Sequence, residues 1–143
     1  MEYSDPASFP GYAIVRVAHL LEQRMEKALR ADAGLSVRQF SILACLARQP
    51  HIGSGELARA VLVTPQSMGS LIDTLERRGL VERTRHGGRG TRLALSLTDA
   101  GHAALSAGYK VAGRLREAER AVLGNHQEQL LDLLDRLHAA LTA

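Results

Sequence analysis

SGELARAVLVTPQSMGSLIDTLERRGLVERTRHGGRGTRLALSLT, residues 54–98, is the stretch that decides the fold. Ser54 is a predicted N-cap and opens a helix of about two turns. A second helix is expected to begin with Thr64 as its cap and Pro65 at its first position, and to stop at Gly79. The two short helices therefore abut across a tight turn.

The second helix is predicted to be amphipathic. Apolar residues recur at helical spacing and form one stripe that faces the core. This stripe holds Met68, Leu71, Ile72 and Leu75. The opposite face is polar but hardly charged, and it carries Gln66, Ser67, Ser70, Asp73, Thr74 and Arg77.

A β-hairpin is expected directly after these helices. LVERT (80–84) and RLALSL (92–97) have alternation typical of strands, and the HGGRG between them has turn chemistry. Arg83 fits a solvated strand residue. Three further arginines cluster around the glycines of the tip and are stronger functional candidates: Arg85, Arg89 and Arg92.

Helices are predicted on both sides of this region. Apolar spacing indicates a helix over about 12–30, ended by Gly34, and a capping box at Ser36 and Gln39 opens a helix over about 37–49. Thr98 is expected to cap a long helix that runs to about Leu123, and a final helix follows. The predicted organisation is one compact unit with an N-terminal arm, a central winged region and a C-terminal arm, at residues 1–35, 36–98 and 99–143.

The two terminal arms carry more apolar surface than one contact face needs, which predicts a partner chain. In the final helix, Leu131 and Leu133 widen an already apolar stripe. The residues expected to pair two copies are Ile14, Leu21, Leu130, Leu134, Leu137 and Leu141.

Composition narrows the class of protein. The chain has 143 residues, of which 45% are hydrophobic and 3% aromatic, and this favours an aliphatic, mainly helical domain. No apolar run approaches the roughly 20 residues that span a bilayer, so a cytoplasmic protein is expected. The net charge of +3 is uneven, at −1, +5 and −1 over the three predicted regions, and a central basic block is typical of proteins that bind polyanions.

The order of elements predicts a mainly α, α+β fold: a winged helix-turn-helix. A major groove about 12 Å wide admits a helix whose side chains read base edges. Arginines on a wing reach phosphates or the more negative minor groove. Double-stranded DNA is therefore the expected partner.

The stretch ELARAVLVTPQSMGSLIDTLERRGLVERTRHGGRGTRLALSLTDAGHAAL resembles the core of the MarR (multiple antibiotic resistance regulator) family of winged-helix transcription factors. LERRGLVER leads into the wing and LSLTDAG leads out of it, and the flanking helices suit the family too. The resemblance implies an obligate homodimer held by both terminal arms, repression of nearby genes, and often release by a small phenolic or anionic ligand.

The resemblance also implies roles for individual residues. Residues 65–78 become the recognition helix, with base contacts from Gln66, Ser67, Ser70 and Thr74. Thr64 and Arg77 would lie near the DNA backbone, and Ser54 would meet a phosphate. The chain departs from the family at Ser70 and Thr74, where many relatives have arginine, and at a wing tip that lacks the usual acid. Thr91 holds the expected wing arginine position, between Arg89 and Arg92.

A pocket for an effector is expected near Val15, His19 and Cys45, because the family binds ligands between the dimer helices and the winged helix. Cys45 sits in an apolar run and fits a small core residue better than a redox sensor. The six histidines show no metal-ligand spacing, and no nucleophile motif or phosphate loop is present. No metal, cofactor or catalytic residue is therefore predicted.

Two alternatives remain open from the sequence. A winged helix with a weakly charged reading face also suits a protein-interaction module whose wing meets an acidic protein surface. A ligand-binding protein that no longer binds DNA is the other. Binding to DNA separates both from the main prediction.

Overall fold

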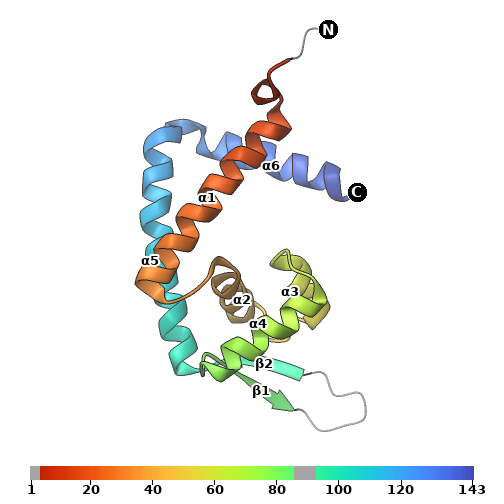
Figure 1. Cartoon of the computed structure of the whole chain (residues 1–143), viewed down its shortest axis with the longest axis vertical. Helices are drawn as coiled ribbons and strands as arrows, with labels where there is room; N and C mark the ends of the chain where they lie inside the picture. Colours follow the sequence, from red (N-terminus) through yellow and green to blue (C-terminus); the bar gives the residue numbers. More distant parts are fainter. Residues whose placement is uncertain (1–3, 86–92) are drawn as a thin grey trace. The chain divides into compact units, whose positions relative to one another are not determined.

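The computed structural model of the chain describes residues 4–85 and 93–143, and the side chains of Arg85 and Leu93 lie outside what it describes. Helices dominate, with one antiparallel hairpin (Figure 1). The elements are η1 Pro6–Ser8, α1 Pro10–Ala33, α2 Val37–Arg48, α3 Ser54–Ala60, α4 Pro65–Arg77, β1 Val81–Arg85, β2 Leu93–Leu97, α5 Asp99–Leu123, η2 Gly124–His126 and α6 Gln127–Thr142.

The helix limits follow local chemistry. α1 ends at Gly34, whose φ of 64° is the left-handed conformation that glycine adopts freely. The predicted capping box opens α2, because the Ser36 hydroxyl accepts from the Gln39 amide while the Gln39 side chain accepts from the Ser36 amide. Thr64 caps α4, with Pro65 at its first position as expected.

The prediction that Ser54 caps α3 is wrong. Gly53 is the N-cap and makes no side-chain cap bond, and Ser54 is the first helical residue. The Gly53 carbonyl accepts from the Leu57 amide at 2.8 Å and so starts the helix through the backbone. Glycine is itself an acceptable cap, because no β-carbon restricts its approach to the first turn.

The two strands form the expected antiparallel hairpin, with Val81 opposite Leu97 and Arg83 opposite Leu95. Val81 and Leu95 are buried, and they join a core built from α2, α3, α4 and the start of α5. The core is aliphatic, as expected from a chain with few aromatic residues. Its buried members include Leu35, Ile42, Leu43, Leu46, Leu57, Met68, Ile72, Leu75 and Leu105.

α5 lies directly on this core through two glycines. Thr98 caps the helix, because its hydroxyl accepts from the Gly101 amide at 3.0 Å. A β-carbon at Gly101 would stand 2.0 Å from the Leu80 carbonyl oxygen, and one at Gly108 would stand 2.5 Å from the Phe40 ring. These glycines therefore allow a close approach that a larger residue would block.

The single compact unit expected from the sequence is not found. The chain forms two compact units, Met1–Val111 and Ala112–Ala143, which divide inside α5. Within the second unit, α6 contains no buried residue, so it has little to hold it to a core of its own chain. The assignment of 1–35 and 99–143 as dimerisation arms around 36–98 stays a prediction. None of the described helices is long and apolar enough to cross a membrane.

Candidate nucleic-acid interface

The turn between α3 and α4 sets the direction in which α4 leaves. The Val63 amide donates to the Ala58 carbonyl and the Leu62 amide to the Arg59 carbonyl, which is the Schellman pattern of a helix C-terminus. Leu62 has a φ of 59° and is 77% exposed. The turn of the helix-turn-helix is thus closed by a leucine at a position that usually takes glycine.

The same motif ends α4 with the usual residue. The Leu80 amide donates to the Leu75 carbonyl and the Gly79 amide to the Glu76 carbonyl, and Gly79 has a φ of 69°. The chain then enters β1 immediately. The recognition helix is therefore closed at both ends by local hydrogen bonds that also fix its neighbours.

The two faces of α4 separate as predicted. Met68, Ile72 and Leu75 are buried, and Leu71 packs partly buried against the core. Gln66, Ser67, Ser70 and Arg77 are exposed, and Thr74 is half-buried. The helix therefore turns a row of polar side chains to solvent.

The polar side chains of this row differ in the hydrogen bonds that they make within the protein. Thr64 donates to the Ser67 hydroxyl at 3.0 Å, so these two share the capping turn. Thr74 donates to the Ser70 carbonyl at 3.0 Å, which engages its hydroxyl along the helix. Gln66 makes no side-chain hydrogen bond to any residue that the structure describes. Of the predicted base-reading residues, Gln66 is therefore among the freest to bond outward.

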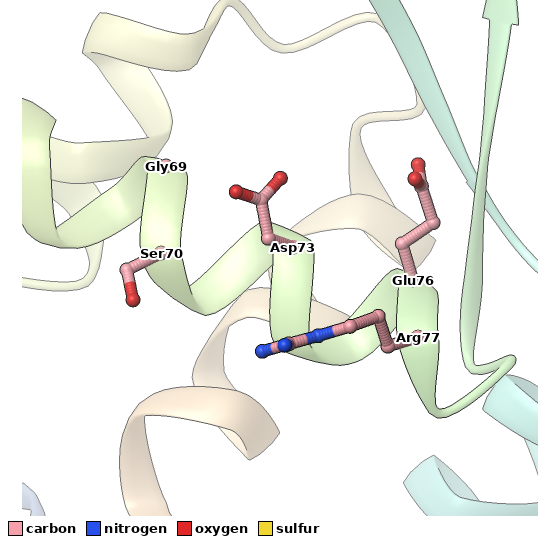
Figure 2. Close-up of a pocket in the computed structure, with 5 residues that line it drawn as sticks. All are labelled: Gly69, Ser70, Asp73, Glu76 and Arg77. Atoms are coloured by element: carbon pink, nitrogen blue, oxygen red, sulfur yellow. The ribbon is translucent and has the colours of Figure 1, made fainter.

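A surface hollow of about 610 Å³ lies on this face, lined by Gly69, Ser70, Asp73, Glu76 and Arg77. Figure 2 shows the Arg77 guanidinium reaching back along the helix on the side of Ser70, while Glu76 points to the side of the hairpin strands. Arg77 donates to the Thr74 hydroxyl at 3.3 Å. The lining of the hollow thus combines one guanidinium, one hydroxyl and two carboxylates.

Arg78 has a different role from its neighbour. It donates to the Gly34 carbonyl at 2.7 Å and to the Gln39 side-chain oxygen at 3.2 Å. These bonds join the end of α4 to the junction of α1 and α2. The two adjacent arginines therefore differ: Arg77 lies on the surface, and Arg78 joins parts of the fold. The spacing of residues in the sequence did not predict this role of Arg78.

α1 is joined to the winged helix by two more polar links. Arg38 donates to the Val61 carbonyl at 3.2 Å and to Glu22 at 3.2 Å, so it spans from α1 to the turn between α3 and α4. Glu26 accepts from the Val37 amide at 2.7 Å and from Arg30 at 2.6 Å. The orientation of the recognition helix is therefore linked to α1.

Arg83 is more than a solvated strand residue. Its guanidinium pairs with Asp73 and, through Nε at 2.9 Å, with Glu76. Strand alternation places Arg83 on the same face of β1 as buried Val81, and β1 packs against α4. One arginine therefore joins the wing strand to two acids on the recognition helix.

The other predicted sites lie at several places. Arg89 and Arg92 are outside the described residues, as is the side chain of Arg85. Ser54 is exposed at the first position of α3. Val15 and His19 are exposed on α1, whereas Cys45 packs partly buried against the core, as a small apolar residue would. Their roles in phosphate and effector binding stay predictions.

The predicted dimerisation residues are exposed or half-buried within the chain. Ile14 and Leu21 lie on α1, and Leu134 is half-buried on α6. Leu130 and Leu137 are each more than a third exposed, and Leu141 is 78% exposed. Within residues 4–85 and 93–143, no three histidine, cysteine or acidic side chains come together as a metal site would require.

Comparison with known proteins shows which family this chain resembles. A family model described as the MarR family matches residues 35–88. The HTH-type transcriptional repressor Rv2887 of Mycobacterium tuberculosis is 32% identical over 131 residues, which cover 89% of this chain and 91% of the relative. The relative is named as a transcriptional repressor, which agrees with the prediction of a regulator.

Solved structures agree with the sequence match. The M. tuberculosis MarR family protein Rv2887 in complex with salicylic acid superposes with a TM-score of 0.70 at 31% identity, covering 91% of this chain and 96% of that one. The transcriptional repressor CouR bound to a 23-mer DNA duplex gives 0.84 at 27% identity, covering 96% and 98%. The winged helix-turn-helix fold is thereby confirmed, and the chain belongs to the MarR family of transcriptional regulators.

Proposed function

We propose that this protein is a ligand-responsive transcriptional repressor that binds DNA through α4 and the hairpin. The observation that carries the proposal is the exposed polar face of α4, whose apolar face is buried in the core. A helix held in this way can enter a major groove without unfolding. The basic charge of residues 36–98 favours the same partner.

We propose the individual contacts from the family resemblance, and the exposed polar face of α4 supports those assigned to that helix. Gln66, Ser67, Ser70 and Thr74 face bases in this proposal, and Thr64, Arg77 and Ser54 lie by the backbone. Arg85, Arg89 and Arg92 belong to the wing and reach phosphates or the minor groove. Because such wing contacts carry little sequence information, α4 is the element that selects the site.

The working form is a homodimer that reads an inverted repeat. The exposed leucines of α6 and the apolar residues of α1 supply the surface that two copies would share. A two-fold dimer presents two recognition helices to half-sites about 10 base pairs apart. The cytoplasm is the compartment that we propose for this DNA-binding regulator, which agrees with its family.

An effector completes the proposal. The relative Rv2887 has been solved with salicylic acid, and CouR with p-coumaroyl-CoA. A small aromatic or anionic ligand is the class that we propose for this chain too, near Val15, His19 and Cys45. Such a ligand would lower DNA affinity only if it binds the free dimer more tightly than the DNA-bound dimer.

The test is selection of bound duplexes from random DNA with the purified protein, followed by anisotropy on the selected site. An inverted repeat bound far more tightly than scrambled DNA is the expected result. Salicylate is then titrated into the complex and should release the DNA. Absence of any preferred duplex would overturn the proposal and favour a protein-interaction module.

A further inference from the structure

The recognition helix of this protein carries exposed acidic side chains. Negative charge is unfavourable on a surface that binds DNA. Asp73 and Glu76 both line the hollow on α4, together with Ser70 and Arg77 (Figure 2). The Asp73 side chain is 61% exposed and that of Glu76 is 43% exposed. Unpaired, two carboxylates on each recognition helix would repel the phosphates of a duplex.

Arg83 compensates both acids at once. Its Nε pairs with Glu76 at 2.9 Å, and a terminal nitrogen pairs with Asp73. The planar guanidinium suits this double contact, since it presents several donors in one fixed fork. The side chain is 32% exposed, and two of its three nitrogens are already occupied by α4.

We propose that Arg83 is a positioning residue that makes α4 acceptable to DNA by pairing with Asp73 and Glu76, and that it is not itself a phosphate contact. The bridge also holds β1 against α4, so the wing and the recognition helix meet a duplex as one surface. This inference rests on the proposed function, because it concerns the same DNA interface.

The two possible roles of Arg83 predict different effects on DNA binding when its side chain is removed. If Arg83 acts through the acids, its loss leaves two unpaired carboxylates, and removing those carboxylates should restore binding. If Arg83 contacts phosphate, its loss removes a cation from the DNA, and the state of the acids is irrelevant. A double-mutant cycle separates these cases.

The experiment measures operator affinity by anisotropy across a salt series, at protein concentrations that keep the assembly intact. Arg83→Met is made in the wild type and in an Asp73→Asn/Glu76→Gln background. Arg77→Met, in the same two backgrounds, is the matched control, because Arg77 also lies on α4 but pairs with neither acid in the described residues. Thermal unfolding verifies that each variant folds.

Arg83→Met is expected to weaken binding about tenfold or more in the wild type, and by no more than about twofold in the acid-free background. Arg77→Met should weaken binding equally in both. The salt slope should stay unchanged by Arg83→Met in the acid-free background, because no phosphate contact is lost.

The inference is supported if the two Arg83→Met penalties differ by a factor of about five or more, and any smaller factor overturns it. Equal penalties with a flattened salt slope would make Arg83 a phosphate contact. A wild-type protein that binds no DNA would instead overturn the proposed function, and the inference with it.

Discussion

Leu62 holds a backbone conformation that leucine rarely adopts. Its φ of 59° lies in the left-handed region, where a β-carbon crowds the following carbonyl at a cost of about 1–2 kcal/mol. Little burial offsets this cost, since the side chain is largely exposed. Gly79 performs the same turn at the end of α4 without that penalty.

Leu62→Gly is therefore expected to raise the free energy of unfolding by about 0.5–1 kcal/mol, because relief of the backbone exceeds the added entropy of the unfolded chain. Urea unfolding at fixed protein concentration measures it. Leu62→Ala is the control, because alanine keeps the β-carbon and should bring no such gain. A less stable Leu62→Gly protein would show that the exposed leucine makes a contact that matters more than its backbone.

Substitutions of Gln66 and of Arg89 are expected to weaken DNA binding in different ways. Gln66→Ala should cost about 1–3 kcal/mol on the selected site with little change in salt slope, because a base-edge hydrogen bond releases no counterions. Arg89→Ala should weaken strong and weak sites alike and flatten the slope by up to about 2 units, one contact from each protomer. Anisotropy over a salt series distinguishes them. If Arg89→Ala changes neither affinity nor slope, the wing tip is only a solvated turn.

At the scale of elements, α5 packs closely against the winged helix because it has glycine at two points of contact. Gly101 lies under the Leu80 carbonyl where α4 passes into β1, and Gly108 lies under the Phe40 ring of α2. Phe40 in turn meets the Tyr109 ring edge-on, with centroids 5.3 Å apart. The first half of α5 is thus held by the close approach at these glycines as well as by the burial of Leu105 and Val111.

Gly101→Ala should lower the free energy of unfolding by about 1–3 kcal/mol or more, because its β-carbon meets a carbonyl oxygen that cannot move without the strand. Gly113→Ala in the same helix is the matched control. No atom of the described residues lies within 4 Å of a β-carbon there, and alanine should gain up to about 1 kcal/mol from helix propensity. Equal effects of the two substitutions would contradict the close approach.

The sequence predicts those elements whose signals are local. The capping residues Ser36 and Thr64 bond to an amide three residues ahead, so residue types a few positions apart were enough. Arg78 bonds to Gly34 across 44 positions and Arg83 reaches Asp73 across 10, and no periodicity encodes such tertiary partners. Leu62 was missed because a left-handed turn is normally signalled by glycine.

At the scale of the whole molecule, assembly is the property that most needs a direct test. Leu134→Glu together with Leu137→Glu should give a monomeric or unfolded protein, because unpaired charges in a buried interface cost several kcal/mol. Sedimentation compares it with the wild type. Glu128→Ala, at an exposed acid in the first turn of the same helix, is the control and should leave the assembly intact. A wild type that sediments as a monomer at micromolar concentration would contradict the proposed dimer.

The lack of any buried residue in α6 has a consequence for how long the protein survives. If two copies pair through α6 as proposed, this helix would be open to proteases in the single chain and protected in the dimer. Newly made chains would then be short-lived while scarce and durable once abundant, since mass action governs how many are covered. The half-life of the regulator would thereby rise with its own synthesis, and dilution at cell division would shorten it again.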